Sequence, residues 1–211
     1  MSKIQAIADA VQTGKFKIID DLIGEALDSG VDPNEILNQG MIEAMAKIGV
    51  KFQNNEIFVP EMLVSAKTMK KGIERLKPHL ASDAVGKKGK FIIGTVRGDL
   101  HDIGKNLVAL MIESSGFEII DLGVDVTPQA FVEAIKEHPD CKLIGASALL
   151  TTTMGALKNT VDAIVDAGLR DQVKIMVGGA PITQEYADEI GADAYSPNAG
   201  AAAVKANELI A

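Results

Sequence analysis

Residues 90–106 read KFIIGTVRGDLHDIGKN, and they decide the class of the fold. The first part, 90–96, is a short run of apolar and β-branched residues, which is typical of a buried strand. The second part is polar, contains Gly98 and Gly104, and leads into a helical pattern. We therefore expect 90–96 to be the first strand of an α/β domain, with a loop and a helix after it.

Strand and helix patterns alternate through the rest of the chain. Further strands are predicted at 118–122, 143–147, 174–177 and 192–195. Helices fill the gaps: Thr127 and Pro128 cap and open one of them, and 201–210 forms the last. Five strands separated by crossover helices indicate a doubly wound parallel sheet of the flavodoxin-like or Rossmann-like kind. Such sheets bind ligands at the carboxyl ends of their strands.

The first eighty residues show helical periodicity and no strand pattern. Apolar residues recur at helical spacing along 4–11, 19–26, 37–48 and 63–76. Asp32, Pro33 and Glu35 mark the start of the third helix, and Pro60 opens the fourth. We therefore predict an α/β protein with a four-helix bundle over 1–85 and a five-stranded domain over 86–211. The boundary falls in the polar stretch 82–89.

Composition narrows the classes of protein. The 211 residues are 47% hydrophobic, which is enough for packed cores. The start, MSKIQAIADA, has no continuous apolar segment, so we expect a cytoplasmic protein without membrane contact. A net charge of -8 argues against nucleic-acid binding, and the basic tract at 87–90 is too short to reverse it. The single cysteine, Cys141, excludes an internal disulfide framework.

The loop after the first strand is the expected ligand site, but it matches neither common phosphate-binding motif. The Gly98 to Gly104 spacing is one residue too long for a Walker A loop, Lys105 precedes Asn106 where that motif has Ser or Thr, and no Gly-x-Gly-x-x-Gly is present. What remains is His101, two residues after Asp99. The carboxylate can orient the ring and raise its basicity, as in metal sites, although a lone His near an Asp is more often structural.

A metal site made by the protein alone is disfavoured. His79 and His138 lie far from His101 in sequence, and no thiolate cluster exists. A metal at His101 would therefore arrive inside a cofactor.

Three motifs in order resemble the signature of cobalamin-binding domains. They are Asp99-x-His101-x-x-Gly104, then Ser147-x-Leu149 after 42 residues, then Gly178-Gly179 after 28 more. In that family the benzimidazole tail of the cofactor leaves cobalt and is buried in the domain, and a histidine takes its place. The resemblance implies that His101 is the lower ligand of cobalt in a cobalamin or related corrinoid.

The resemblance assigns roles to further residues. Asp99 would hold His101, and Thr153 would continue the relay with its hydroxyl, where methionine synthase has serine. Ser147 and Leu149 would contact the nucleotide tail, and Gly178 and Gly179 would let the backbone approach it. The same likeness places Asp102, Ile103, Gly104 and Thr151 among the cofactor-binding residues.

The N-terminal helices resemble the cap of methionine synthase and of small corrinoid proteins, through KFQNNEIFVP at 51–60. Phe52 and Val59 align with two apolar residues that cover the upper face of cobalt, although both also fit a bundle core. The likeness implies a methyl carrier: cob(I)alamin takes a methyl group from a substrate on a partner, and methylcob(III)alamin passes it to an acceptor such as tetrahydrofolate or a thiol.

The implied partners are a substrate-specific methyltransferase, a methylcorrinoid:acceptor methyltransferase and a reductive activase. The resemblance to a cap and a cofactor domain covers essentially all 211 residues and includes no catalytic barrel. We therefore expect a carrier subunit and not a complete enzyme. A cobalamin-dependent sensor is the main alternative, and it lacks support because no DNA-binding segment is evident. A small mutase subunit would explain the second domain but not the cap.

Overall fold

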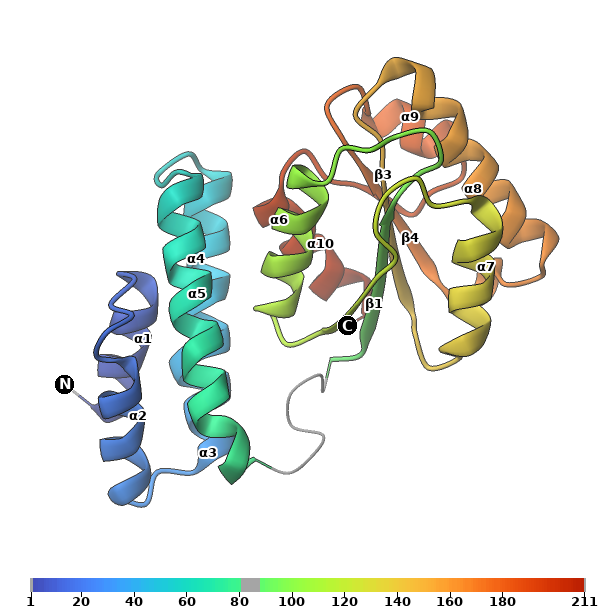
Figure 1. Ribbon diagram of the computed structural model, residues 1–211. Helices are drawn as coiled ribbons and strands as arrows, with labels where there is room; N and C mark the ends of the chain where they lie inside the picture. Colours follow the sequence, from blue (N-terminus) through green and yellow to red (C-terminus); the bar gives the residue numbers. More distant parts are fainter. Residues whose placement is uncertain (1, 81–87, 211) are drawn as a thin grey trace. The chain divides into compact units, whose positions relative to one another are not determined.

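The computed structural model describes residues 2–80 and 88–210, and within them the chain forms two compact units, one of helices and one of α/β architecture (Figure 1). Each unit has its own buried apolar residues. The predicted boundary at 82–89 falls mostly outside the described residues.

The helical unit is the predicted four-helix bundle. Its elements are α1 (Lys3–Gln12), α2 (Ile19–Asp28), α3 (Pro33–Glu35), a π-helical turn (Ile36–Ile42), α4 (Glu43–Gln53), α5 (Val59–Leu76) and a final 3-10 turn (Lys77–His79). Segments α3 to α4 form one continuous helical run. Asp32 caps this run, because its carboxylate accepts the Asn34 N–H at 2.8 Å and the Glu35 N–H at 3.3 Å. Helix α5 starts one residue before Pro60, with Glu61 accepting the Phe58 N–H at 2.8 Å.

The bundle is held together by aliphatic side chains and methionines from every long helix. Those with at most 1% of their surface exposed include Ile7, Val11, Ile23, Met45 and Met69. Each of them lies on the apolar face that the periodicity predicted. Burial of a side chain of this size contributes about 1.5 to 3 kcal/mol to folding.

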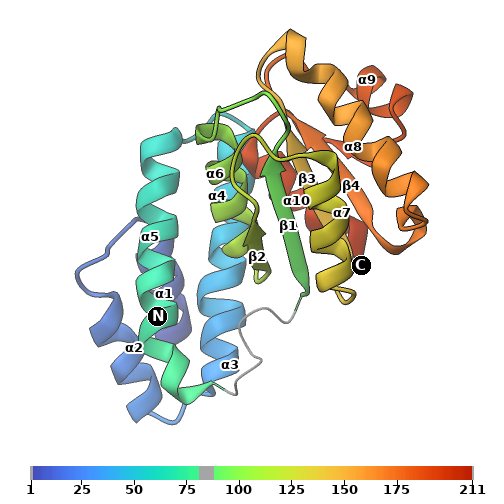
Figure 2. The ribbon, with the colours of Figure 1, turned by 45° about the vertical axis from the view of Figure 1, so that its right-hand side comes forward.

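The second unit is built on a five-stranded parallel sheet of order β2-β1-β3-β4-β5, the flavodoxin-like arrangement (Figure 2). The strands are β1 (Lys90–Thr95), β2 (Glu118–Asp121), β3 (Leu143–Ser147), β4 (Lys174–Gly178) and β5 (Ala194–Tyr195). In register, Thr95 pairs with Ser147, and Ser147 pairs with Gly178. The ends of three neighbouring strands therefore lie level with one another.

Helices cover both faces of this sheet. They are α6 (Ile103–Glu113), α7 (Pro128–Glu137), α8 (Met154–Asp166), α9 (Gln184–Glu189) and α10 (Ala199–Ile210). Helices α7 and α8 lie on one face, and α6 and α10 lie on the other (Figure 1). A hydrophobic core between the sheet and helices α7 and α8 includes Phe131, Ile144, Leu157 and Ile175, all with 0% exposure.

Two predicted boundaries near the end of the chain were wrong. Strand β5 begins at Ala194 and not at 192, because the Asp193 carboxylate accepts the Ile175 N–H at 2.7 Å and pairs with Arg170. Helix α10 begins at Ala199 and not at 201, because Asn198 caps it by accepting the Ala201 N–H at 2.8 Å. The other four strands end within one residue of their predicted limits.

In residues 2–80 and 88–210, no helix combines the length and the apolar character needed to cross a membrane.

The close packing of β1 against β3 predicts a specific stability effect. A Cβ added to Gly145 would lie 2.5 Å from the ring of Phe91, which is fully buried. We expect Gly145→Ala to lower the free energy of unfolding by about 1 to 3 kcal/mol, as over-packing does. Gly155→Ala on α8 is the matched control, since no described atom lies within 4 Å of its added Cβ, and it should be neutral or stabilising. Equal urea midpoints for the two variants would contradict the prediction.

Candidate functional site

The strand order places the site between β1 and β3. The connection after β1 runs to β2 at one edge of the sheet, and the connection after β3 runs to β4, toward the other edge. Doubly wound sheets bind ligands at the carboxyl ends of two strands whose connections diverge in this way. Residues 97–102, the histidine loop, follow β1, and residues 148–153, the β3 turn, follow β3. The first two predicted motifs are therefore brought together by the topology alone.

Asp99 and His101 form the centre of this site. The Asp99 side chain is completely buried, and its Oδ1 lies 2.7 Å from His101 Nδ1 and accepts the His101 backbone N–H at 3.1 Å. Because an ionised carboxylate can only accept, Nδ1 carries the hydrogen. Half of the His101 side chain is exposed. The ring is thus oriented as a ligand.

The second oxygen of Asp99 ties the histidine loop to the β3 turn. Oδ2 accepts the Leu149 N–H at 2.7 Å, the Leu150 N–H at 3.3 Å and the Thr153 hydroxyl at 2.7 Å. Burial by itself raises the pKa of the Asp99 carboxyl, but the hydrogen bonds from Leu149, Thr153 and His101 outweigh it and hold the pKa well below its usual range. Asp99 therefore stays ionised at neutral pH.

A second relay runs beneath the histidine loop and was missed in the sequence analysis. The buried Thr95 hydroxyl donates to the His101 carbonyl at 2.9 Å, so its oxygen is free to accept from the Ser147 hydroxyl 3.0 Å away. Ser147 is thereby linked to the backbone of His101. The signal for Thr95 was a polar residue near the carboxyl end of an apolar strand.

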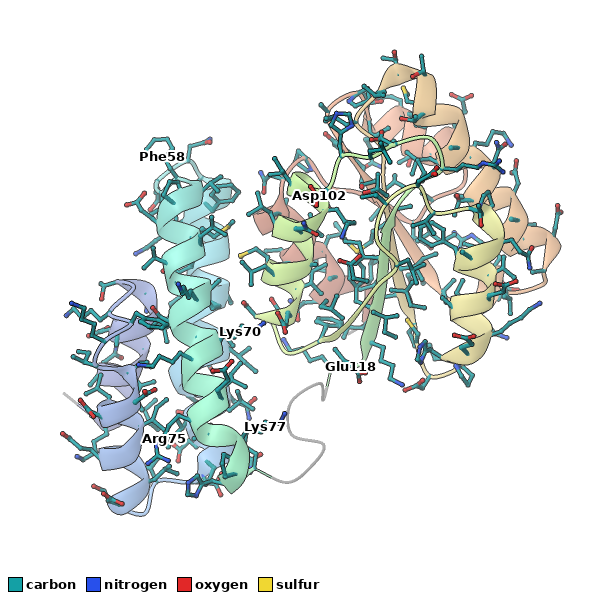
Figure 3. The ribbon with its side chains drawn as sticks, viewed as in Figure 1. Phe58, Lys70, Arg75, Lys77, Asp102 and Glu118 are labelled. Atoms are coloured by element: carbon teal, nitrogen blue, oxygen red, sulfur yellow. The ribbon has the colours of Figure 1, made fainter. Side chains whose placement is uncertain are left out.

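The other predicted residues of this unit line the same edge of the sheet. Asp102, labelled in Figure 3, comes directly before α6, and Ile103 and Gly104 begin that helix. All three are exposed, Ile103 by 78%. Leu149 and Thr151 lie exposed in the β3 turn.

Gly178 and Gly179 end β4, beside β3. Gly179 has φ +131°, and a Cβ there would lie 1.8 Å from the Ala148 carbonyl oxygen, so only glycine fits. This need arises from packing within the protein, a reason that the sequence alone did not reveal.

Phe52 and Val59 belong to the helical unit. Phe52 lies near the end of α4, Val59 begins α5, and both are half-buried. The turn between them carries Phe58, which is 69% exposed and points away from the helices (Figure 3). Phe58 was not predicted as a site residue, and its exposure makes it the more accessible aromatic side chain at this end of the bundle.

Comparisons with known proteins agree with this geometry. Residues 89–206 match the family model of the B12 binding domain, and residues 3–77 match a second model described in the same words. The dimethylamine corrinoid protein of Methanosarcina barkeri is 42% identical over 209 residues, covering 99% of this chain and 97% of the relative. The chain belongs to the small corrinoid proteins of methyltransferase systems.

Two solved structures share the architecture of this corrinoid protein. A cobalamin-binding protein from Desulfitobacterium hafniense has a TM-score of 0.83 and 30% identity over 98% of both chains. The methanol:cobalamin methyltransferase complex MtaBC of Methanosarcina barkeri has a TM-score of 0.86 and 27% identity, covering 99% of this chain and 79% of that one. The cofactor of this family, and of this chain, is a cobalamin or related corrinoid.

The residues of the site fit such a cofactor. Asp99 holds the His101 ring through Nδ1, and an imidazole oriented by a carboxylate in this way is a common metal ligand in proteins. Beside it, a Cβ at Gly104 would meet no described atom within 4 Å, so the protein itself does not need glycine there. An open surface next to a directed ligand nitrogen suits a flat macrocycle. No group of three or more His, Cys, Asp or Glu in the described residues is arranged to bind a bare metal ion.

The hydrogen bond from the Thr153 hydroxyl to the ionised Asp99 carboxylate should contribute measurably to stability. Its oxygen is within reach of both Asp99 Oδ2 at 2.7 Å and the Leu150 carbonyl at 2.9 Å, and the carboxylate is the stronger acceptor. Thr153→Val should lower the free energy of unfolding at pH 7 by about 1.5 to 3 kcal/mol. Thr153→Ser keeps the hydroxyl and should show less than half of that loss.

The pH dependence of this stability loss tests whether Asp99 is the partner of Thr153. A folded-state pKa below the unfolded value of about 3.9 stabilises the protein above that value, and the stabilisation is lost as the pH falls through the folded-state pKa. Since Thr153→Val raises the folded-state pKa of Asp99, its gap from the parent should narrow below about pH 4. Urea unfolding of the cofactor-free protein at several pH values measures this gap, and one that is unchanged by pH would exclude Asp99 as the partner.

Proposed function

We propose that this chain is a methyl carrier in which His101 Nε2 is the lower ligand of a corrinoid cobalt. The observation that supports it most directly is the 2.7 Å contact between buried Asp99 and His101 Nδ1, at the binding edge of the sheet. When bound, the corrinoid supplies a cobalt centre that accepts a methyl group from one partner's substrate and gives it to a second acceptor, such as tetrahydrofolate or a thiol.

The protein's own contribution is to hold and tune the histidine. Asp99 fixes the tautomer and raises the basicity of Nε2, and Thr153 and the β3 turn fix Asp99 in turn. The Asp99 and His101 pair would hold the cobalt of a bound corrinoid through one oriented ring nitrogen. We propose that Ser147, Leu149, Thr151, Gly178 and Gly179 line the nucleotide tail, and that Phe52 and Val59 contact the upper face of the corrinoid.

The partners are proposed from the relatives. A methyltransferase that binds the methyl donor, a methylcorrinoid:acceptor methyltransferase and a reductive activase complete the cycle. Relatives named for dimethylamine and trimethylamine are 39 to 42% identical to this chain, and the one from a methanol complex is 27% identical. Methylated amines are therefore the first donors to test.

Ligation by His101 predicts a spectroscopic signature. The protein loaded with cob(II)alamin should show nitrogen superhyperfine splitting in its EPR spectrum, and labelling of histidine with nitrogen-15 should change the splitting from a triplet to a doublet pattern. His101→Ala should abolish the labelled pattern, while His138→Ala, on the polar end of α7, should leave it intact. A splitting that is insensitive to histidine labelling would reject the ligand assignment.

A carrier needs a partner to activate the methyl donor. An amine or an alkoxide is a poor leaving group, and the described site offers His101 as a ligand but no acid aimed at a donor. We expect the loaded, reduced protein to take no methyl group from methylamines, methanol or methoxyarenes at turnover rates until a cognate methyltransferase is added. Stopped-flow absorbance of the reduced corrinoid measures this rate. Rapid methylation of the corrinoid without a second protein would show that the chain is a complete enzyme. No methylation with any methyltransferase added would favour a sensor.

A further inference from the structure

The segment after β2 forms a fixed platform beside the histidine loop. We call residues 122–126 the β2 loop. It is bound to β1 at three points: Leu122 donates its N–H to the Ile93 carbonyl at 2.8 Å, Thr95 donates to Gly123 at 2.9 Å, and Val126 donates to Thr95 at 2.9 Å. Backbone bonds of this kind make the loop an extension of the sheet edge.

Asp125 connects this platform to the start of the histidine loop. Its Oδ1 accepts the Gly98 N–H at 2.7 Å, and its own N–H donates to the Asp99 carbonyl at 3.0 Å. Asp125 has φ +53°, in the left-handed region, which aspartate tolerates better than most residues. The unusual backbone conformation aims both groups of one residue at the turn that carries Asp99.

Lys105 connects the end of β2 to the first turn of α6, just past His101. The residue is only 3% exposed, and its Nζ lies 2.6 and 2.7 Å from the two carboxylate oxygens of Asp121. Nζ also donates to Asn106 Oδ1 at 2.7 Å, and Asn106 Nδ2 donates to Asp102 Oδ2 at 3.1 Å. The chain of contacts therefore reaches the residue next to the ligand histidine.

We propose that Asp125 and the Lys105 and Asp121 pair are positioning residues that clamp the two ends of the histidine loop. They touch neither His101 Nε2 nor the open surface beside Gly104, so they act through Asp99 and the start of α6. Fixing both ends restricts the loop before cobalt binds, and preorganisation of this kind lowers the cost of binding. The proposal rests on His101 being the cobalt ligand.

The geometry provides variants that separate positioning from stability. Asp125→Gly keeps the left-handed backbone but removes the acceptor, and Asp125→Asn keeps both. Lys105→Met removes the buried charge with similar volume and leaves Asp121, whose side chain is 40% exposed, to water. Removal of one ion-pair partner is costly chiefly when it leaves a buried unpaired charge, and the exposed Asp121 carboxylate is not left in that state. Lys90→Met is the control, because Lys90 pairs with Asp140 at the start of β1, at the end of that strand away from the histidine loop.

The experiment is a titration of each variant with cob(II)alamin. EPR gives the ratio of histidine-bound to histidine-free cobalt, absorbance gives the dissociation constant, and urea unfolding of the cofactor-free protein gives its stability. We expect Asp125→Gly and Lys105→Met each to lower the histidine-bound ratio by about 2- to 10-fold, the loss that one hydrogen bond's free energy would produce. Asp125→Asn and Lys90→Met should stay within about 2-fold of the parent.

Each result decides something. A parent without histidine nitrogen splitting would refute the proposed ligand, which is a separate failure. If the parent shows the splitting and both Asp125→Gly and Lys105→Met match it, the clamp is refuted. It is also refuted if Lys90→Met lowers the ratio as much as they do, because general loss of stability would then account for the effect.

Discussion

The carboxylate of Asp99 is the contact on which the site depends. Its side chain is completely buried, and the hydrogen-bond donors that surround it stabilise its ionised form. These donors come from two segments that are about fifty residues apart in sequence, the histidine loop and the β3 turn. The parallel pairing of β1 with β3 is what brings these segments to one place. The hydrogen bonds of Asp99 therefore depend on the order of the strands in the sheet.

The sequence predicted the parts of this arrangement that repeat along the chain. Helical and strand periods gave the bundle, the five strands and the doubly wound sheet, because buried faces must be apolar wherever they occur. The motif around His101 predicted a ligand loop after the first strand, and the family likeness predicted the corrinoid that the comparisons confirm. Errors were confined to ends such as Ala194 and Ala199, where a single cap or carboxylate decides the boundary.

The remaining features could not be predicted from the sequence, for three physical reasons. Leu149 and Leu150 bind Asp99 through backbone N–H groups, which leave no trace in residue type. Thr95, Asp125 and Lys105 have ordinary side chains whose importance depends on which loops meet in space. Gly179 must be glycine because an added Cβ would meet the carbonyl of Ala148, a neighbour that only the folded chain places beside it. Short-range patterns carry no information on such meetings across the sheet.

The Asp99 carboxylate bonds both the histidine loop and the β3 turn, and Asp125 of the β2 loop bonds the start of the histidine loop. The short motif around His101 therefore cannot be moved alone to another protein. Grafting 97–102 alone onto another parallel sheet would leave the aspartate buried without its amide donors, at a cost of several kcal/mol for an unmatched charge. A transplant would have to include the β3 turn and Asp125 with their strand order. For engineers who wish to build such a site elsewhere, the smallest transferable unit is therefore the three adjacent strands β2, β1 and β3 with the loops that follow them.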